Sequence, residues 1–184
     1  MTDEPFARSP LEERSGDLET IGAHLLPLLT QIDFRVDPAN AGRSPYPLPL
    51  EPNTSFEDDG VEVLWLGPDE WLIVGPSGSA ARITSALETP FSDVHRSIVD
   101  ASANRVAFEL ASGDRLDLLS HICSLDLEPP AWAPGRCAQT LVGRAQVLLQ
   151  ERRNGTRLFI RPSFAGYMVD LLLQVRSVRD DLGA

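Results

Sequence analysis

The amino-acid sequence predicts an α+β fold, with antiparallel sheets that each carry helices on one face. Two observations predict this class. Short apolar stretches with period-two alternation are joined by turn signals at Gly67–Glu70 and at Asn154-Gly155, which is typical of antiparallel hairpins. Apolar residues also recur at helical spacing in three further segments. The expected order is strand, hairpin, helix, strand, strand, helix, hairpin, helix, and helices separated by antiparallel strands indicate this fold class.

The chain of 184 residues is long enough for one good-sized domain. Residues 1–24 are mostly polar and charged, include Pro5 and Pro10, and hold few apolar residues, so we expect a flexible N-terminal arm. Such an arm can also wrap around a partner and become ordered there. Residues 25–184 are expected to form the folded domain.

The stretch between Val61 and Gly75 is expected to form the centre of the core. Residues 61–66 alternate as a strand does, and Pro68 and Asp69 supply turn chemistry after them. Residues 71–74 are continuously apolar and end at Gly75-Pro76, which indicates a second strand buried on both faces. The sequence therefore predicts an antiparallel hairpin that places two tryptophans in the core.

The other elements follow from the same signals. Five prolines in residues 37–53 exclude a long helix there and leave only a short turn near Ala39–Arg43. Residues 125–136 are rich in proline and are expected to be irregular. Further strands are predicted at residues 32–36, 98–99, 105–110, 139–142, 146–150 and 156–160. Helices are predicted from Ser77–Ser79 to about Leu87, after Ser112 as N-cap (Leu116, Leu119, Ile122), and after Ser163 as N-cap (Phe164, Tyr167, Met168, Leu171, Leu172, Val175).

Composition excludes several classes of function. The net charge of −11 argues against binding to nucleic acid or to an anionic membrane, since both require a cationic surface. Every basic residue is arginine, so a lysine Schiff base and a P-loop lysine are excluded. No segment is long and apolar enough to span a bilayer, and the acidic N-terminus does not resemble a signal peptide. We therefore expect a cytoplasmic protein with reduced thiols.

Nucleophiles are sparse and their surroundings favour structural roles. Ser102, Ser112 and Ser163 precede turns or helices, and none lies in a Gly-x-Ser-x-Gly motif, so helix capping is the better interpretation. Cys137 follows Arg136, which could lower the pKa of the thiol. The alternative, a small buried side chain beside a turn, is the one we favour.

Acid, base and metal patterns are equally weak. Cys123 and Cys137 with His24, His95 and His121 do not form a zinc pattern. Asp69 and Glu70 are possible catalytic acids, but carboxylates in loops are usually solvated. The residues alone predict no catalytic residue, no cofactor-binding residue and no metal ligand in this chain.

Seven stretches, taken in order, resemble the gamma subunit family of heterotetrameric sarcosine oxidase. They cover nearly all of the chain from about residue 25 to residue 175. The stretches are Thr30-Gln31-Ile32-Asp33-Phe34-Arg35, Pro52-Asn53-Thr54, Leu66-Gly67-Pro68-Asp69-Glu70-Trp71-Leu72, Val99-Asp100-Ala101-Ser102 with Arg105, Cys123-Ser124-Leu125-Asp126-Leu127, Pro134-Gly135-Arg136-Cys137-Ala138-Gln139-Thr140-Leu141, and Arg161-Pro162-Ser163-Phe164-Ala165-Gly166-Tyr167.

The resemblance implies a shortened form of the tetrahydrofolate-binding domain of the glycine-cleavage T-protein. It also implies a non-catalytic structural subunit that packs on the alpha subunit, in a complex with beta and delta subunits. In that class of enzyme the alpha and beta subunits hold NAD, FAD and FMN. Sarcosine is oxidatively demethylated to glycine, oxygen is reduced to hydrogen peroxide, and the one-carbon unit passes to tetrahydrofolate or leaves as formaldehyde.

Two other hypotheses remain beside the interaction subunit. An interaction subunit predicts an exposed apolar patch, for which the candidates are the N-terminal arm and Glu128–Pro134 with Trp132. A free-standing tetrahydrofolate-binding module instead needs a carboxylate for the pterin ring, supplied by Asp69, Glu70 or Asp100. An aminomethyl-transferring enzyme is less favoured, because the sequence shows no acid or base on a second domain.

Overall fold

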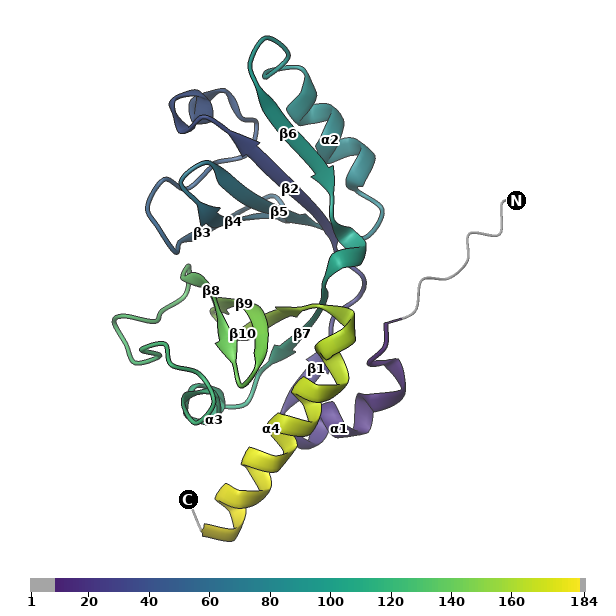
Figure 1. The fold of residues 1–184 in the computed structure, drawn as a ribbon, viewed down its shortest axis with the longest axis vertical. Coiled ribbons are helices and arrows are strands. Elements are labelled where there is room, and N and C mark those ends of the chain that lie inside the picture. Colours follow the sequence, from purple (N-terminus) through teal and green to yellow (C-terminus); the bar gives the residue numbers. More distant parts are fainter. Residues whose placement is uncertain (1–8, 183–184) are drawn as a thin grey trace, which may run out of the picture.

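The computed structural model describes residues 9–182 and arranges them as two five-stranded antiparallel sheets packed face to face (Figure 1). Helices lie on the outer face of each sheet, so the expected fold class is confirmed. Sheet A has the strand order β1-β7-β10-β9-β8, and sheet B has the order β3-β4-β5-β2-β6. Three apolar clusters result: one between the sheets, and one under the helices of each sheet.

Sheet B is formed by the first half of the chain and is covered by one helix. Its strands are β2 (Thr30–Val36), β3 (Ser55–Asp58), β4 (Val61–Gly67), β5 (Glu70–Gly75) and β6 (Arg96–Asp100), and its helix is α2 (Ala80–Glu88). The proline-rich stretch between β2 and β3 contains only the short 3-10 helix η2 (Pro38–Arg43), as predicted. A second 3-10 helix, η3 (Ser102–Asn104), links sheet B to sheet A.

Sheet A contains the second half of the chain and strand β1. Its strands are β1 (Ala23–Leu25), β7 (Val106–Leu110), β8 (Cys137–Val142), β9 (Ala145–Arg152) and β10 (Gly155–Ile160). Its outer face is covered by the 3-10 helix η1 (Glu12–Arg14) and the helices α1 (Ser15–Thr20), α3 (Arg115–Ser120) and α4 (Pro162–Leu182). Residues 125–136 are irregular, as predicted.

The β4–β5 hairpin lies at the centre of sheet B, as the sequence predicts. Trp65 pairs with Trp71, and alternate residues of β5 enter different clusters. Trp71 and Ile73 pack under α2, whereas Leu72 and Val74 pack between the sheets. Because side chains alternate across a strand, a continuously apolar strand is the expected solution where both faces are covered.

The flexible arm predicted for residues 1–24 needs correction over residues 9–24. This segment forms η1, α1 and part of β1, and Leu11, Leu18 and Ile21 are fully buried in the cluster that includes α4. Arg14 also forms an ion pair with Asp170 of α4 at 2.7 Å. Three apolar side chains on one face are enough to order the segment, although their density along the sequence is low. Residues 1–8 lie outside the described residues.

Two predicted helix caps are also wrong. The N-cap of α3 is Asp114, because Ser112 first forms a turn in which its carbonyl accepts from the Arg115 amide at 3.2 Å. Helix α4 begins at Pro162, so Ser163 lies inside its first turn. Proline is well suited to the first helical position, since its φ is preset and the missing N–H has no partner there.

Candidate functional site

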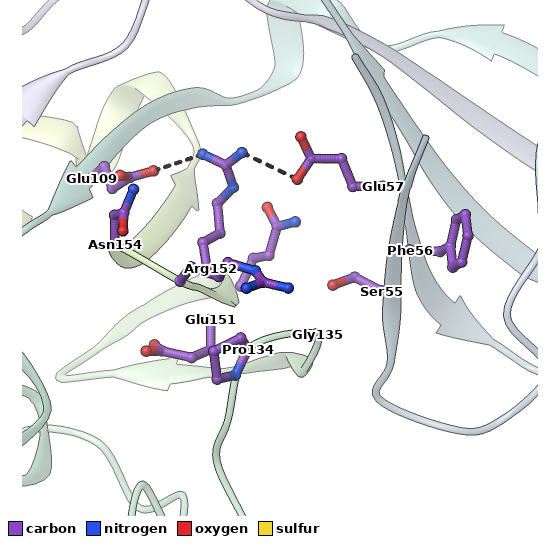
Figure 2. Close-up of a pocket in the computed structure, with 11 residues that line it drawn as sticks. Ser55, Phe56, Glu57, Glu109, Pro134, Gly135, Glu151, Arg152 and Asn154 are labelled. Carbon is purple, nitrogen blue, oxygen red and sulfur yellow. Dashed lines mark hydrogen bonds and ion pairs between the residues drawn. The ribbon is translucent and has the colours of Figure 1, made fainter. Parts of the chain in front are cut away.

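A cavity of about 440 Å³ lies where β3, the edge strand of sheet B, approaches sheet A (Figure 2). Arg152 lies between two carboxylates in it: Nη1 donates to Glu109 Oε2 at 3.2 Å, and Nη2 donates to Glu57 Oε2 at 3.4 Å. The walls are formed by Ser55, Phe56, Glu57, Glu109, Pro134, Gly135 and the residues from Gln150 to Asn154.

The charges continue from this cavity into the buried space between the sheets. Arg157 Nη1 donates to Glu62 Oε1 at 2.8 Å, and the second carboxylate oxygen of Glu62 accepts a bond from the Gln150 amide. Arg152 Nε lies 3.5 Å from Glu62 Oε2. We call this set the inter-sheet ion network; its members are Glu57, Glu62, Glu109, Gln150, Arg152 and Arg157.

The inter-sheet ion network is arranged for structure. Burial alone would lower the pKa of Arg152, but Glu62, Glu109 and Glu57 outweigh it and raise the pKa, which keeps the guanidinium charged. Every charged member has an oppositely charged neighbour within 4 Å. Buried charges need such partners, because an unpaired one loses its hydration without compensation. The network therefore joins β3 and β4 of sheet B to β7, β9 and β10 of sheet A.

Sequence reasoning missed this network, although the sequence contains a signal for it. Glu62, Gln150 and Arg157 each lie inside a strand whose neighbouring residues are apolar. A polar residue in such a strand is either exposed on a solvated face or paired inside the protein. Only the facing of the two sheets selects the second possibility.

The predicted acids Asp69 and Glu70 lie at the turn of the central hairpin. Asp69 forms an ion pair with Arg35 at 3.2 Å, and both side chains are half exposed. Burial, then the nearby Asp33 carboxylate, raises the pKa of Glu70, although Arg35 opposes the shift. No His, Cys, Asp or Glu group of three that could hold a metal ion occurs within residues 9–182.

Asp100 lies apart from these two acids. In the sheet register Arg35 of β2 pairs with Glu70, whereas Asp100 pairs with Ile32 from the opposite side of β2. Three residues along a strand span about 10 Å, so Asp100 and Glu70 do not share one binding point. The structure therefore does not bring together Asp69, Glu70 and Asp100, the carboxylates expected for a pterin ring.

The serines and the thiol take structural positions. Ser102 Oγ accepts a bond from the Gln31 amide at 3.0 Å and donates to Asp100, which ties η3 to β2. Cys137 is fully buried between the sheets, and its Sγ lies 3.2 Å from the Thr54 carbonyl. Burial raises the pKa of Cys137 to about 12, so the neighbouring Arg136 does not activate the thiol.

The three histidines are dispersed over the molecule. His24 lies on β1, His95 precedes β6 and His121 follows α3, and all three side chains are exposed. The prediction that they do not form a zinc site with the cysteines agrees with these positions. None of the helices in residues 9–182 combines the length and the hydropathy that a bilayer span requires.

Trp132 does not belong to an exposed apolar patch, contrary to our expectation. Its ring is buried, and Nε1 donates to Glu151 Oε2 at 3.0 Å. Glu151 is buried too, and it also accepts bonds from Arg115 and Thr156. The loop around Trp132 is thus fixed to β9, because a buried indole N–H needs an acceptor. As a partner surface, residues 128–134 are therefore less apolar than their sequence indicates.

Comparisons with known proteins agree on the family. The model of the family described as "Sarcosine oxidase, gamma subunit family" matches residues 37–179. The chain belongs to this family. The sarcosine oxidase subunit gamma of an Arthrobacter species is 31% identical over 155 residues, which cover 77% of this chain and 75% of the relative. The same subunit from Corynebacterium sp. (strain P-1) is 33% identical over 122 residues, which cover 65% of this chain and 58% of the relative.

Solved structures show the same likeness in three dimensions. A chain of heterotetrameric sarcosine oxidase from Corynebacterium sp. U-96, solved with pyrrole 2-carboxylate, matches with a TM-score of 0.83 and 26% identity, over 92% of this chain and 94% of that chain. Glycine cleavage system aminomethyltransferase T from Bartonella henselae matches with a TM-score of 0.62 and 12% identity, over 85% of this chain and 48% of that chain. The second match confirms the T-protein-like fold and nothing beyond the fold.

Two of the family-like stretches form a seam between the sheets of this gamma-family chain. The Ser55 amide donates to the Gly135 carbonyl at 2.7 Å, and the Cys137 amide donates to the Asn53 carbonyl at 2.9 Å. Backbone bonds of this kind hold the start of β8 against the start of β3. The resemblance thus rests in part on residues that position the two sheets.

Proposed function

We propose that this chain is a non-catalytic structural subunit of a heterotetrameric sarcosine oxidase. That enzyme oxidatively demethylates sarcosine to glycine, reduces oxygen to hydrogen peroxide, and passes the one-carbon unit to tetrahydrofolate or releases it as formaldehyde. The observation that supports the proposal best is the match, at a TM-score of 0.83, to nearly the whole length of a chain from such an oxidase. A subunit that matches over both full lengths can occupy the same place in an assembly.

The proposed partner is the alpha subunit, in a cytoplasmic complex that also contains the beta and delta subunits. FAD, FMN and NAD belong to those partners in this proposal. The inter-sheet ion network supports it, because the strongest cluster of charged side chains in this chain is used to join its two sheets. The chain then contributes a shape and a surface to the complex.

Reconstitution tests this function directly. The tagged full-length chain is expressed alone and together with the other three subunits, and sarcosine-dependent hydrogen peroxide formation is measured for each preparation. We expect a flavin-containing complex that oxidises sarcosine, and no turnover by the chain alone. Glu70→Gln and Asp100→Asn in the complex are expected to leave kcat unchanged, because neither carboxylate touches a reacting group.

Other results would support a different function. Turnover by the isolated chain, with a rate that falls by about a hundredfold on changing one of its own acids, would identify a catalytic subunit. Micromolar binding of tetrahydrofolate to the isolated chain in a calorimetric titration would favour the folate-binding module. We expect no heat of binding, since Asp100 lies apart from Asp69 and Glu70.

A further inference from the structure

Arginines without a carboxylate partner are concentrated at one end of sheet A. Among the residues that the structure describes, ten arginines form ion pairs, and the following five do not: Arg82, Arg105, Arg144, Arg153 and Arg161. Arg105 precedes β7, Arg144 precedes β9 and Arg161 follows β10. In a chain of net charge −11, a group of three unpaired cations requires an explanation.

The register of sheet A explains why these three arginines meet. Ile160, the last residue of β10, pairs with Val106 at the start of β7 and with Val147 near the start of β9. The residues just outside these three strand ends therefore lie side by side. Arg153 follows the opposite end of β9, and nine residues of extended chain place it about 30 Å from Arg144.

Two adjoining hollows run between these side chains. The smaller, of about 60 Å³, is lined by Arg105, Gln139, Gln146 and Arg161 among others. The larger, of about 470 Å³, shares the last three of these residues and adds Arg144, Leu141 and Phe164. We call this surface the arginine recess; its members are Arg105, Gln139, Leu141, Arg144, Gln146, Arg161 and Phe164.

The charge of the recess is uncompensated at its mouth. Burial lowers the pKa of the half-buried Arg105, Arg161 lowers it further, and Asp33 and Glu70 of sheet B oppose both effects. Arg105 is thus partly neutralised from the inner side. Arg144 and Arg161 are exposed and have no described carboxylate within 4 Å, so they present positive charge to solvent.

The recess also presents apolar surface. Leu141 is 56% exposed and Phe164 is 41% exposed, and both line the larger hollow. Each belongs to a predominantly buried element, β8 and α4, and could have been polar at no cost to the core. Arginine and aromatic side chains beside exposed aliphatic ones are the combination enriched at protein–protein interfaces.

We propose that the arginine recess binds an acidic segment of a partner subunit, in which Asp or Glu side chains flank an apolar residue. The inference rests on the proposed function, since it needs an assembly. Carboxylates pair with Arg144 and Arg161 by charge-assisted, bidentate bonds, and the apolar residue covers Leu141 and Phe164. A small anion would leave those two side chains exposed, and the acidic surface elsewhere on the chain disfavours a nucleic acid.

The test compares two charge-reversal variants of the full-length chain, co-expressed with the other sarcosine oxidase subunits. Arg144→Glu/Arg161→Glu alters the recess. Arg82→Glu/Arg153→Glu is the matched control, because it changes the net charge equally at two exposed, unpaired arginines outside the recess. Captured subunits are identified and quantified by mass spectrometry, and circular dichroism verifies the fold of each variant.

We expect the recess variant to retain its partners at least tenfold more weakly than the wild type, and the control variant to match the wild type. Association of the wild type should also weaken as salt is raised, because exposed charges are screened. If the reversal variant fails to fold, Arg144→Gln/Arg161→Gln serves in its place, with a several-fold loss expected.

The outcomes separate this inference from the proposed function. A wild-type chain that captures no sarcosine oxidase subunit overturns the proposed function and this inference with it. A recess variant that captures its partners as well as the wild type overturns the inference alone. A recess variant that keeps its partners but loses binding of inorganic phosphate would identify a small-anion site instead, and would equally overturn the inference.

Discussion

At the scale of single residues, burial decides chemistry in this chain. Cys137 follows an arginine in sequence, which is the arrangement that activates a thiol when both groups are exposed. Here the thiol lies in the apolar space between the sheets, and its pKa is raised to about 12 by burial. Trp132 shows the same effect, because an indole expected at the surface is buried and bonded to Glu151.

Alkylation tests the buried state of Cys137. At pH 8 a thiol with this pKa is ionised in roughly one molecule in ten thousand, and the side chain has no access to solvent. We therefore expect iodoacetamide to modify Cys137 only as fast as the protein unfolds. Peptide mass spectrometry with and without urea measures this. Modification in the native state at the rate of a free thiol would contradict it.

At the scale of elements, the segment from η1 to β1 shows how few side chains are needed to order a polar stretch. Leu11, Leu18 and Ile21 enter the cluster beneath α4, and Arg14 pairs with Asp170. The sequence predicts the β4–β5 and β9–β10 hairpins well, because their turn chemistry and alternation are local. It predicts residues 9–24 poorly, because their order depends on α4, which lies about 150 residues further along the chain.

Substitution in α1 tests whether this segment contributes to stability. Leu18→Ala is expected to lower the free energy of unfolding by about 2–5 kcal/mol, since it leaves a cavity at a fully buried position. Glu19→Ala, at the exposed neighbouring position, is the control and should change it by less than about 0.5 kcal/mol. Urea unfolding measures both. Equal and negligible effects would show that the segment does not pack as described.

At the scale of the whole molecule, two sheets are held together by an apolar layer and by the inter-sheet ion network. Leu64, Leu72, Leu148 and Phe159 form part of the apolar layer. Beside it, Glu62 of sheet B contacts Arg157 and Arg152 of sheet A. Removing one member of such a network leaves an opposite charge buried without a partner, which is costly.

Glu62→Gln tests the network. We expect it to lower the free energy of unfolding by about 3–5 kcal/mol, because Arg157 remains buried and loses its closest carboxylate. Glu57→Gln is the control: Glu57 also belongs to the network, but its side chain is 60% exposed, so a cost below about 1 kcal/mol is expected. Denaturant unfolding distinguishes the two. Equal costs would mean that burial does not govern the network.

The candidate surfaces divide in the same way as the fold. Glu62, Gln150 and Arg157 look like ordinary strand residues until the two sheets face one another. Arg105, Arg144 and Arg161 are separated by up to 56 positions, and only the pairing of β7, β9 and β10 brings them to one end of sheet A. No local pattern in a sequence can encode such a meeting, because it depends on strand order.

The amino-acid sequence was sufficient for the fold class, the two hairpins, the α2 and α4 helices and the family, because each depends on periodicity, turn chemistry or ordered motifs. The arrangement in space was needed for the inter-sheet ion network, the burial of Trp132, the ordering of residues 9–24 and the arginine recess. The physical reason is that these features arise from contacts between distant segments. A residue's type and neighbours give its preferred face, but the packing of the sheets decides what that face meets.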